Sequence, residues 1–217
     1  MVKKIKLYNN FKIPKSHQKS ILLIGNFDGF HLGHQKLFEL AKQYKKKNKI
    51  KFGVVTFDPV PKMFFNNNLK NYRITNLNQK IKYFKNYNVD FVIVKKFDKQ
   101  FSKMKSLNFI EQILYKKLNA KYIFVSNNFR FGNKREGDVE LLKSLEKKFQ
   151  YKIIKPKPLK KKNKIISSTL IRKLLSTGNL DEANKYLNRN WSVEGLVRKG
   201  RMMGKKKIGR ASCSERV

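Results

Sequence analysis

Ile21-Leu-Leu-Ile-Gly25-Asn-Phe-Asp-Gly-Phe-His31-Leu-Gly-His34 is the stretch of sequence that decides the fold of this chain. Its first four residues form an apolar run that is too short for a helix and is closed by a glycine, which predicts a buried strand followed by a turn. From residue 37 to residue 44 apolar side chains recur every three or four positions, which predicts a helix. The stretch therefore reads as strand, turn and helix.

The turn carries candidate functional residues. Gly25 and Gly29 allow a tight backbone turn that comes close to a ligand, and Gly33 does the same between two imidazoles. His31 and His34 are two of the three histidines in the chain, and we expect them at an exposed junction where the helix begins. Free N–H groups and the helix dipole favour phosphate at such a position. The sequence therefore predicts a phosphate site here, although a solvated turn of the same kind also occurs without a ligand.

The remaining chain repeats the same unit. Further strands are expected at 51–57, 90–94, 121–125 and 151–154, with helical patterns between them. Such alternation predicts an α/β fold with a five-stranded parallel sheet and helices on both faces. We expect strand 21–24 at the centre, with the next two strands on one side and the last two on the other. The proline-rich stretch 58–65 is expected to break regular structure.

Two further segments should lie near the carboxyl ends of the strands, where ligands bind in such sheets. The loop 126–137 contains an Asn pair, Arg130 between two aromatic residues and two glycines. It is either part of the site or an ordinary turn with Phe129 or Phe131 in the core. In 165–172, a serine caps a helix that carries Arg172 one turn in, which suits either phosphate binding or capping alone.

Composition limits the class of protein. A chain of 217 residues predicts one main domain, with room for a small appendage. The only cysteine, Cys213, excludes an internal disulfide, and the apolar runs are too short for a membrane span or signal peptide. A cytoplasmic protein is expected. The net charge is +38, but Lys dominates and is spread over every segment, so we expect attraction of nucleotides and flavin rather than specific nucleic-acid or membrane binding.

Four segments together resemble a known family. They read G-N-F-D-G-F-H-L-G-H, T-F-D-P-V-P-K-M-F-F, N-F-R-F-G-N-K-R-E-G-D and I-S-S-T-L-I-R. In this order they are similar to the prokaryotic bifunctional riboflavin kinase/FAD synthetase family, over about residues 18–209. The resemblance implies a Rossmann-like nucleotidyltransferase of the H-x-G-H superfamily. It further implies direct adenylyl transfer from ATP to FMN, giving FAD and pyrophosphate, with Mg²⁺ entering as the ATP complex and no metal site in the protein.

The resemblance also implies roles for individual residues. The catalytic set that contacts the phosphates is His31, His34, Ser168, Thr169 and Arg172. The ATP-binding set is Gly25, Asn26, Phe27, Asp28, Gly29 and Gly33. The flavin-binding set is Phe57, Asp58, Pro61, Asn128 and Arg130. Where the family usually has His-Pro after its second strand, this chain has Val60-Pro61, so one polar contact is expected to be missing.

The C-terminal part departs further from the family. Residues 1–187 are expected to form the FMN adenylyltransferase domain, and 188–217 the start of a riboflavin kinase domain that does not fold alone. Residues 191–209 resemble the first strand and flap of that kinase, whose continuation is not seen, so kinase activity is expected to be absent and the tail poorly ordered. Two alternatives stay open: a nucleotidyltransferase with another acceptor, such as phosphopantetheine or nicotinate mononucleotide, and a basic nucleic-acid-binding module.

Overall fold

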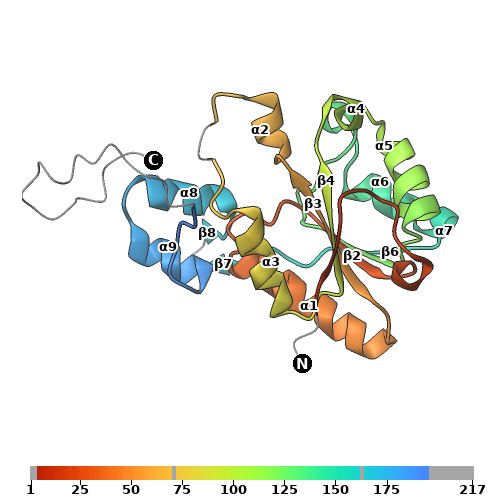
Figure 1. Cartoon of the computed structure of the whole chain (residues 1–217), viewed down its shortest axis with the longest axis horizontal. Coiled ribbons are helices and arrows are strands. Elements are labelled where there is room, and N and C mark those ends of the chain that lie inside the picture. Colours follow the sequence, from red (N-terminus) through yellow and green to blue (C-terminus); the bar gives the residue numbers. More distant parts are fainter. Residues whose placement is uncertain (1–3, 70–71, 162–163, 196–217) are drawn as a thin grey trace, which may run out of the picture.

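The sheet is the centre of the molecule (Figure 1). The computed structural model describes residues 4–69, 72–161 and 164–195. Six parallel strands run in the order β1-β4-β3-β2-β5-β6. Their bounds are β1 Lys6–Tyr8, β2 Ile21–Ile24, β3 Phe52–Asp58, β4 Phe91–Lys96, β5 Tyr122–Phe124 and β6 Lys152–Ile154. The α/β class, the parallel pairing and the central position of residues 21–24 are confirmed.

The predicted number of five strands is wrong, because β1 adds a sixth at the edge beyond β4. This strand is only three residues long, and two of its three side chains are exposed. A short edge strand has neither the continuous apolar run of a buried strand nor a long alternation. Its sequence therefore carried no signal.

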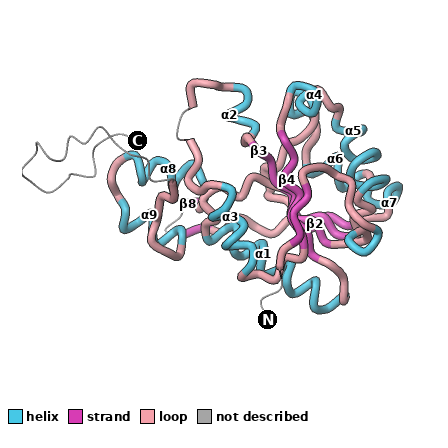
Figure 2. The backbone as a smooth tube through the Cα atoms, viewed as in Figure 1, coloured by secondary structure: helices cyan, strands magenta, loops and turns pink. Residues whose placement is uncertain are grey.

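Helices cover both faces of the sheet (Figures 1 and 2). One face packs against α1 (Leu32–Asn48) and α3 (Leu77–Lys85), and the other against η2 (Phe109–Lys117), α6 (Val139–Ser144) and α7 (Glu146–Phe149). The shorter elements are η1 Lys15–His17, α2 Pro61–Phe65, α4 Lys99–Ser102, α5 Ser106–Asn108, η3 Asn133–Arg135 and the antiparallel pair of β7 Lys160–Lys161 and β8 Lys164–Ile165. Because both faces are covered, all four residues of β2 are buried.

A third, smaller core lies beside the sheet, at the end of the molecule drawn in blue in Figure 1. It is formed by α8 (Ser168–Ser176) and α9 (Leu180–Leu187), which pack against each other and against Ile74. The expected helix after residue 167 is therefore present, and a second helix follows it.

The expectation that residues 58–65 break regular structure is wrong for their second half, which forms a short helix. Pro61 begins the short helix α2, because its missing N–H would have no partner in a first helical turn and its fixed φ suits that position.

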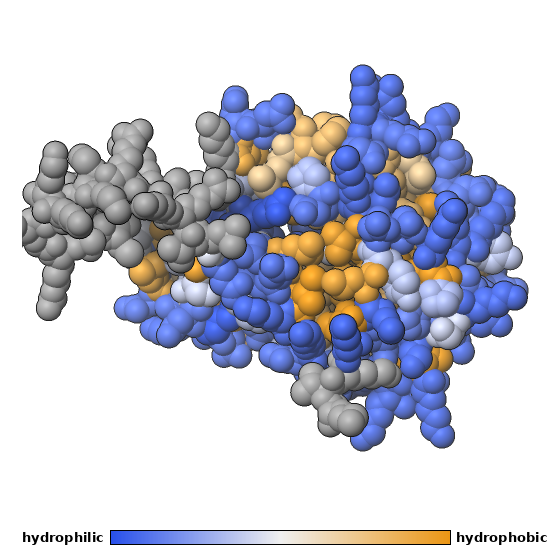
Figure 3. Space-filling view, viewed as in Figure 1, coloured by the Kyte–Doolittle hydropathy of each residue, from blue (hydrophilic) through white to orange (hydrophobic). Residues whose placement is uncertain are grey.

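No helix among the described residues is both long and apolar enough to cross a membrane. Most of the visible surface is hydrophilic, with an apolar area near its centre (Figure 3).

Gly53 offers a test of the sheet packing. A Cβ at Gly53 in β3 would lie 2.1 Å from the ring of Phe91, a side chain with no exposed surface. We expect Gly53→Ala to lower the free energy of unfolding by at least ~1–3 kcal/mol, the usual cost of overpacking a core. Gly195→Ala, where a Cβ meets nothing within 4 Å, is the control. Urea denaturation that gives the two variants equal stability would contradict the packing.

Candidate active site

The turn that joins β2 to α1 has an unusual backbone. Gly29 has φ of +77°, and two non-glycine residues, Phe27 and Phe30, also have positive φ values of 49° and 40°. Such a conformation is unfavourable for bulky side chains and persists only where the surroundings enforce it. Both phenylalanine rings are buried and contact Phe38 edge to face, at centroid distances of 5.1 and 4.9 Å. Aromatic packing under the turn therefore holds it in shape.

Asp28 is the polar centre of this turn. Asp28 is 4% exposed, and its Oδ1 accepts hydrogen bonds from the backbone N–H groups of Ile74 and Thr75 at 2.9 and 3.2 Å. The other oxygen, Oδ2, pairs with Arg172 Nη2 of α8 at 2.8 Å. A buried carboxylate requires this degree of compensation. The ATP-binding role of Asp28 stays a prediction, and its carboxylate is bound within the protein.

The segment 72–75 links several parts of the site. The hydroxyl of Thr75 accepts a hydrogen bond from Gly29 N–H at 3.0 Å, and Arg73 forms an ion pair with Asp58 at the end of β3. The carbonyl of Tyr72 accepts from Arg172 Nε at 3.0 Å, and the Tyr72 ring lies 3.8 Å from the guanidinium. The turn after β2, the end of β3 and helix α8 are thus joined through four consecutive residues.

His31 and His34 form a stacked pair at the start of α1, where His31 is the N-cap residue. Their ring centroids are 3.7 Å apart, at an interplanar angle of 23°. A Cβ at Gly33 would lie 3.1 Å from the His31 ring, so glycine permits this approach. The expected exposed position is wrong, because His31 is 5% exposed and His34 is half-buried. The surrounding aromatic residues cover the junction.

Both imidazoles are neutral at physiological pH. Burial, together with the nearby Arg189 and Arg172, lowers the pKa of His31 to about 4. Burial also lowers the pKa of His34 well below its ordinary value, with additional effects of His31 and Lys80. Nδ1 of each ring is buried with no hydrogen-bond partner among the described residues. A neutral imidazole has one donor and one acceptor nitrogen, so each ring has hydrogen-bonding capacity for a ligand.

The start of α8 lies beside the start of α1. The Ser168 hydroxyl donates to the Asp28 carbonyl at 2.8 Å, and the Ile166 carbonyl lies 3.5 Å from the Cβ position of Gly33. Ser167 is the N-cap residue, because its side chain accepts from Leu170 N–H at 3.2 Å. Thr169 follows in the first turn and is exposed. Two helix N-termini are therefore adjacent, an arrangement that favours anions.

Two cationic residues of the site, Lys80 and Arg189, were not predicted from the sequence. Lys80 of α3 is 3% exposed, and its Nζ donates to the Asn26 carbonyl at 3.2 Å; burial lowers its pKa. Arg189 lies beyond the expected domain boundary and donates to the Gly29 carbonyl at 2.7 Å. In a chain with 52 Lys and Arg residues, neither position stands out. Lys80 lies one helical turn before Phe84, on the buried face of α3, and this position is the one sequence signal that could have identified it.

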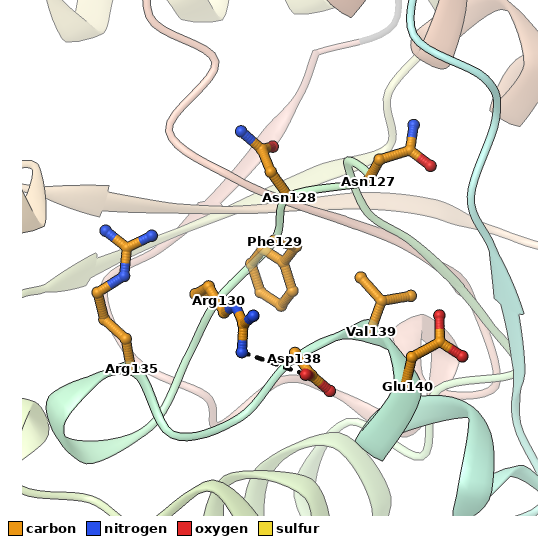
Figure 4. A pocket seen from close by; sticks show the side chains of 8 residues that line it. All are labelled: Asn127, Asn128, Phe129, Arg130, Arg135, Asp138, Val139 and Glu140. Atoms are coloured by element: carbon orange, nitrogen blue, oxygen red, sulfur yellow. Dashed lines mark hydrogen bonds and ion pairs between the residues drawn. The ribbon is translucent and has the colours of Figure 1, made fainter.

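The predicted flavin residues of the loop after β5 line a cavity of about 320 Å³ (Figure 4). Arg130 pairs with Asp138 at 3.1 Å across its wall, and Asn128 Oδ1 accepts from the Ser126 hydroxyl at 3.0 Å. Phe129 and Phe131 stack on each other and pack against the main core. The expected tucking of a phenylalanine into the core is therefore present in a loop that also forms a cavity.

The other predicted flavin residues lie at the end of β3 and the start of α2. The rings of Phe57 and Phe101 stack at 5.8 Å, and ring contacts continue from Phe101 through Phe109 and Phe131 to Phe129. This series of rings connects the two groups of predicted flavin residues. Asp58 is held by Arg73, and Pro61 begins α2. Val60, where the resemblance led us to expect a missing polar contact, is 3% exposed.

Fold and geometry define the class of protein: a parallel α/β domain with a neutral histidine pair at adjoining helix starts, the H-x-G-H form of a nucleotidyltransferase. A family model described as FAD synthetase matches residues 13–170. The chain belongs to the FAD synthetase family.

Named relatives are similar over most of this chain. The bifunctional riboflavin kinase/FMN adenylyltransferase of Buchnera aphidicola subsp. Acyrthosiphon pisum is 43% identical over 89% of this chain and 62% of its own length. The enzyme of the same name from Escherichia coli (strain K12) is 33% identical, over 85% and 59%. The FAD synthetase of Listeria monocytogenes is 31% identical, over 88% and 77%. The chain thus spans about three fifths of the bifunctional relatives' length.

A solved structure has the same fold. It is a protein from Streptococcus pneumoniae named a macrolide-efflux protein, with a TM-score of 0.74 and 27% sequence identity, covering 87% of this chain and 72% of its own. The activity in that name is said of the Streptococcus pneumoniae protein and is not assigned to the present chain. The likeness supports the fold of the present chain.

The lowered pKa of His31 gives a prediction about stability. Between pH 6.5 and about 4 the unfolded chain binds a proton that folded His31 does not, so the free energy of unfolding should fall as the pH drops through this range. At about 1.36 kcal/mol per pKa unit, the contribution is on the order of 3 kcal/mol. Urea denaturation from pH 7 to pH 4 should show a shallower fall for His31→Gln than for the wild type. An unchanged slope would show that folded His31 titrates normally.

Asp28→Asn should destabilise the protein. The amide retains an acceptor for Ile74 and Thr75, but the charged bond to Arg172 is lost in a buried site. Hydrogen bonds to charged groups contribute about 1.5–3 kcal/mol, and we expect a loss of that size in chemical denaturation. Glu111→Gln breaks the exposed pair with Lys116 and should leave stability nearly unchanged. Equal stability of both variants would show that the Asp28 carboxylate does not stabilise the fold.

Proposed function

We propose that this chain transfers the adenylyl group of ATP to FMN, giving FAD and pyrophosphate. The observation that carries the proposal is the neutral histidine pair at two adjoining helix starts, in a member of the FAD synthetase family. A terminal phosphate oxygen of FMN attacks the α-phosphorus of ATP in line, and the bond to the β-phosphate oxygen breaks. Since FMN supplies the nucleophile, the protein's part is positioning and charge stabilisation.

The histidine pair is suited to the phosphates of ATP. Each neutral imidazole can donate one N–H to a phosphate oxygen, and both lie where N–H groups at the start of α1 add positive potential. Arg172, Arg189 and Lys80 surround the pair, so the site attracts a polyanion without charging the imidazoles. We assign His31 and His34 to the transferred phosphate and the loop Gly25–Gly29, with Gly33, to ATP.

The α8 residues act on the leaving pyrophosphate in this proposal. Arg172 uses only its Nε–H and one Nη2 hydrogen in the contacts to Tyr72 and Asp28, and the remaining N–H groups can bind phosphate. The Ser168 hydroxyl donates its single proton to the Asp28 carbonyl, so it must rotate, or phosphate must bind the backbone N–H groups of the first turn. The exposed hydroxyl of Thr169 is free to turn toward phosphate.

FMN is proposed to lie along the series of aromatic rings between Phe57 and the cavity at Asn128 and Arg130. The apolar rings suit a flat isoalloxazine, and Arg130 suits its phosphate. We place Mg²⁺ with ATP as part of the substrate complex. A cytoplasmic location and the absence of nucleic-acid or membrane partners are inferred from composition alone, and residues 188–217 are proposed as the beginning of a second module.

His34→Ala should nearly abolish FAD formation, because loss of one donor to a developing phosphate charge typically lowers the rate ~10²–10³-fold. Purified protein is incubated with ATP, Mg²⁺ and FMN, and the flavins are separated by chromatography. His17→Ala, which removes the third histidine of the chain, is the control and should keep its activity per folded molecule. Near-normal turnover by folded His34→Ala would exclude the assignment.

The same assay tests the acceptor. FMN is replaced in turn by riboflavin, phosphopantetheine and nicotinate mononucleotide. We expect product with FMN only, and no FMN from riboflavin. A faster reaction with another acceptor would overturn the flavin assignment while leaving adenylyl transfer intact.

A further inference from the structure

The residues that follow α9 lie against α3. We call residues 189–194 the strap. Gln79 Nε2 donates to the Ser192 carbonyl at 2.9 Å, Trp191 Nε1 donates to the Ile74 carbonyl at 3.3 Å, and Lys82 pairs with Glu194 at 2.8 Å. These contacts join the strap to the same segment, at Ile74, that holds the Asp28 carboxylate. The strap is therefore attached to the proposed active site even though it lies past the predicted domain boundary.

Arg189 at the start of the strap binds the turn before His31 directly. Its Nη2 donates to the Gly29 carbonyl at 2.7 Å, and its Nη1 donates to the carbonyls of Phe30 and Leu187 at 3.2 and 3.1 Å. The guanidinium lies 4.1 Å from the Tyr83 ring, which in turn stacks on Phe30 at 5.7 Å. Both Nη atoms of the Arg189 guanidinium thus donate to backbone carbonyls, and its planar face lies against an aromatic ring.

These contacts act on the strained part of the turn. Gly29 and Phe30 both have positive φ, and Phe30 immediately precedes His31. A planar fork that binds two successive carbonyls fixes their relative orientation, and hence the direction in which the chain enters α1. The stacking of His31 on His34 depends on that direction, because the two rings are only three residues apart.

We propose that Arg189 is a positioning residue for the histidine pair. It holds the carbonyls of Gly29 and Phe30 so that both imidazoles face the phosphates in the reaction proposed above, and it ties their geometry to the strap. The inference rests on the proposed function for its catalytic meaning. Its structural content, the placement of the pair, stands independently and is measured without substrate.

NMR of the histidine rings in the ligand-free protein tests the placement. The chain has three histidines, so His17 in η1 serves as an internal control for His31 and His34. We expect Arg189→Gln to move the ring signals of His31 and His34 and to leave those of His17 in place. The pKa of His31 should also rise, because Arg189, one of the two cations that lower it, is lost, while burial and Arg172 still keep it below its ordinary value.

Arg189→Lys separates geometry from charge. The ammonium keeps the positive charge but cannot bind both carbonyls in the fork arrangement, so the ring signals should move while the pKa of His31 changes less. Lys82→Gln breaks the exposed ion pair of the strap and should move neither. Folded Arg189→Gln and Arg189→Lys with wild-type signals at His31 and His34 would overturn the proposal; if Arg189→Gln does not fold, Arg189→Lys alone decides.

Kinetics test the catalytic meaning. We expect Arg189→Gln to lower kcat ~10–10²-fold, as small misplacements of reacting groups do, with a smaller change in KM for ATP and partial recovery in Arg189→Lys. Lys82→Gln should match the wild type. Moved histidine signals with unchanged kcat would refute the link to turnover. A wild-type protein that makes no FAD would instead refute the proposed function, and the NMR result would still decide whether Arg189 places the pair.

Discussion

The buried carboxylate of Asp28 is the interaction on which the rest of the site depends. One oxygen receives two backbone N–H groups from the segment after α2, and the other pairs with an arginine of α8. These three elements are far apart in sequence, and no apolar contact alone would fix their relative positions to within a hydrogen bond. Because the carboxylate is buried, losing any one of its partners is costly, since a charge in a low-dielectric site is tolerated only while it is fully paired. The contacts around the Asp28 carboxylate are therefore expected to form together or to be lost together.

This constraint explains why a strained turn can persist. Positive φ values at two phenylalanines are unfavourable, and each costs on the order of 1–3 kcal/mol. The rings are placed by the strain into a cluster with Phe38 and Phe84, where their burial offsets the cost. Hydrogen bonds from Asp28 and Arg189 then act on the polar side of the same turn. Aromatic packing on one side of the turn and hydrogen bonds on the other determine one conformation, in which two histidines stack at the start of a helix.

More of the fold than of the site could be predicted from the sequence. The alternation of apolar strands and helices predicted the sheet, its order and its two helical layers, since each buried strand is a continuous apolar run between turn residues. Strand β1 was missed because three residues at an edge, two of them exposed, have no hydrophobic pattern. The motif residues of the site stood out as glycines and histidines in unusual combinations. Lys80 and Arg189 did not, because their meaning comes from burial and from carbonyl partners distant in sequence, and a lysine-rich composition hides single functional cations.

The electrostatics of the site follow from where these cations are placed. Arg172, Arg189 and Lys80 are each bound to a carbonyl or carboxylate of the protein, so their positions are fixed before any ligand arrives. Burial is the main reason why the imidazoles stay neutral, and these cations lower the histidine pKa values further, because a protonated histidine beside them would face like charges. A neutral imidazole donates a hydrogen bond without holding an anion as tightly as a charged one would. That combination suits a reaction in which the phosphates must be bound and then released, because the long-range attraction comes from fixed cations and the short-range contact from groups that carry no net charge.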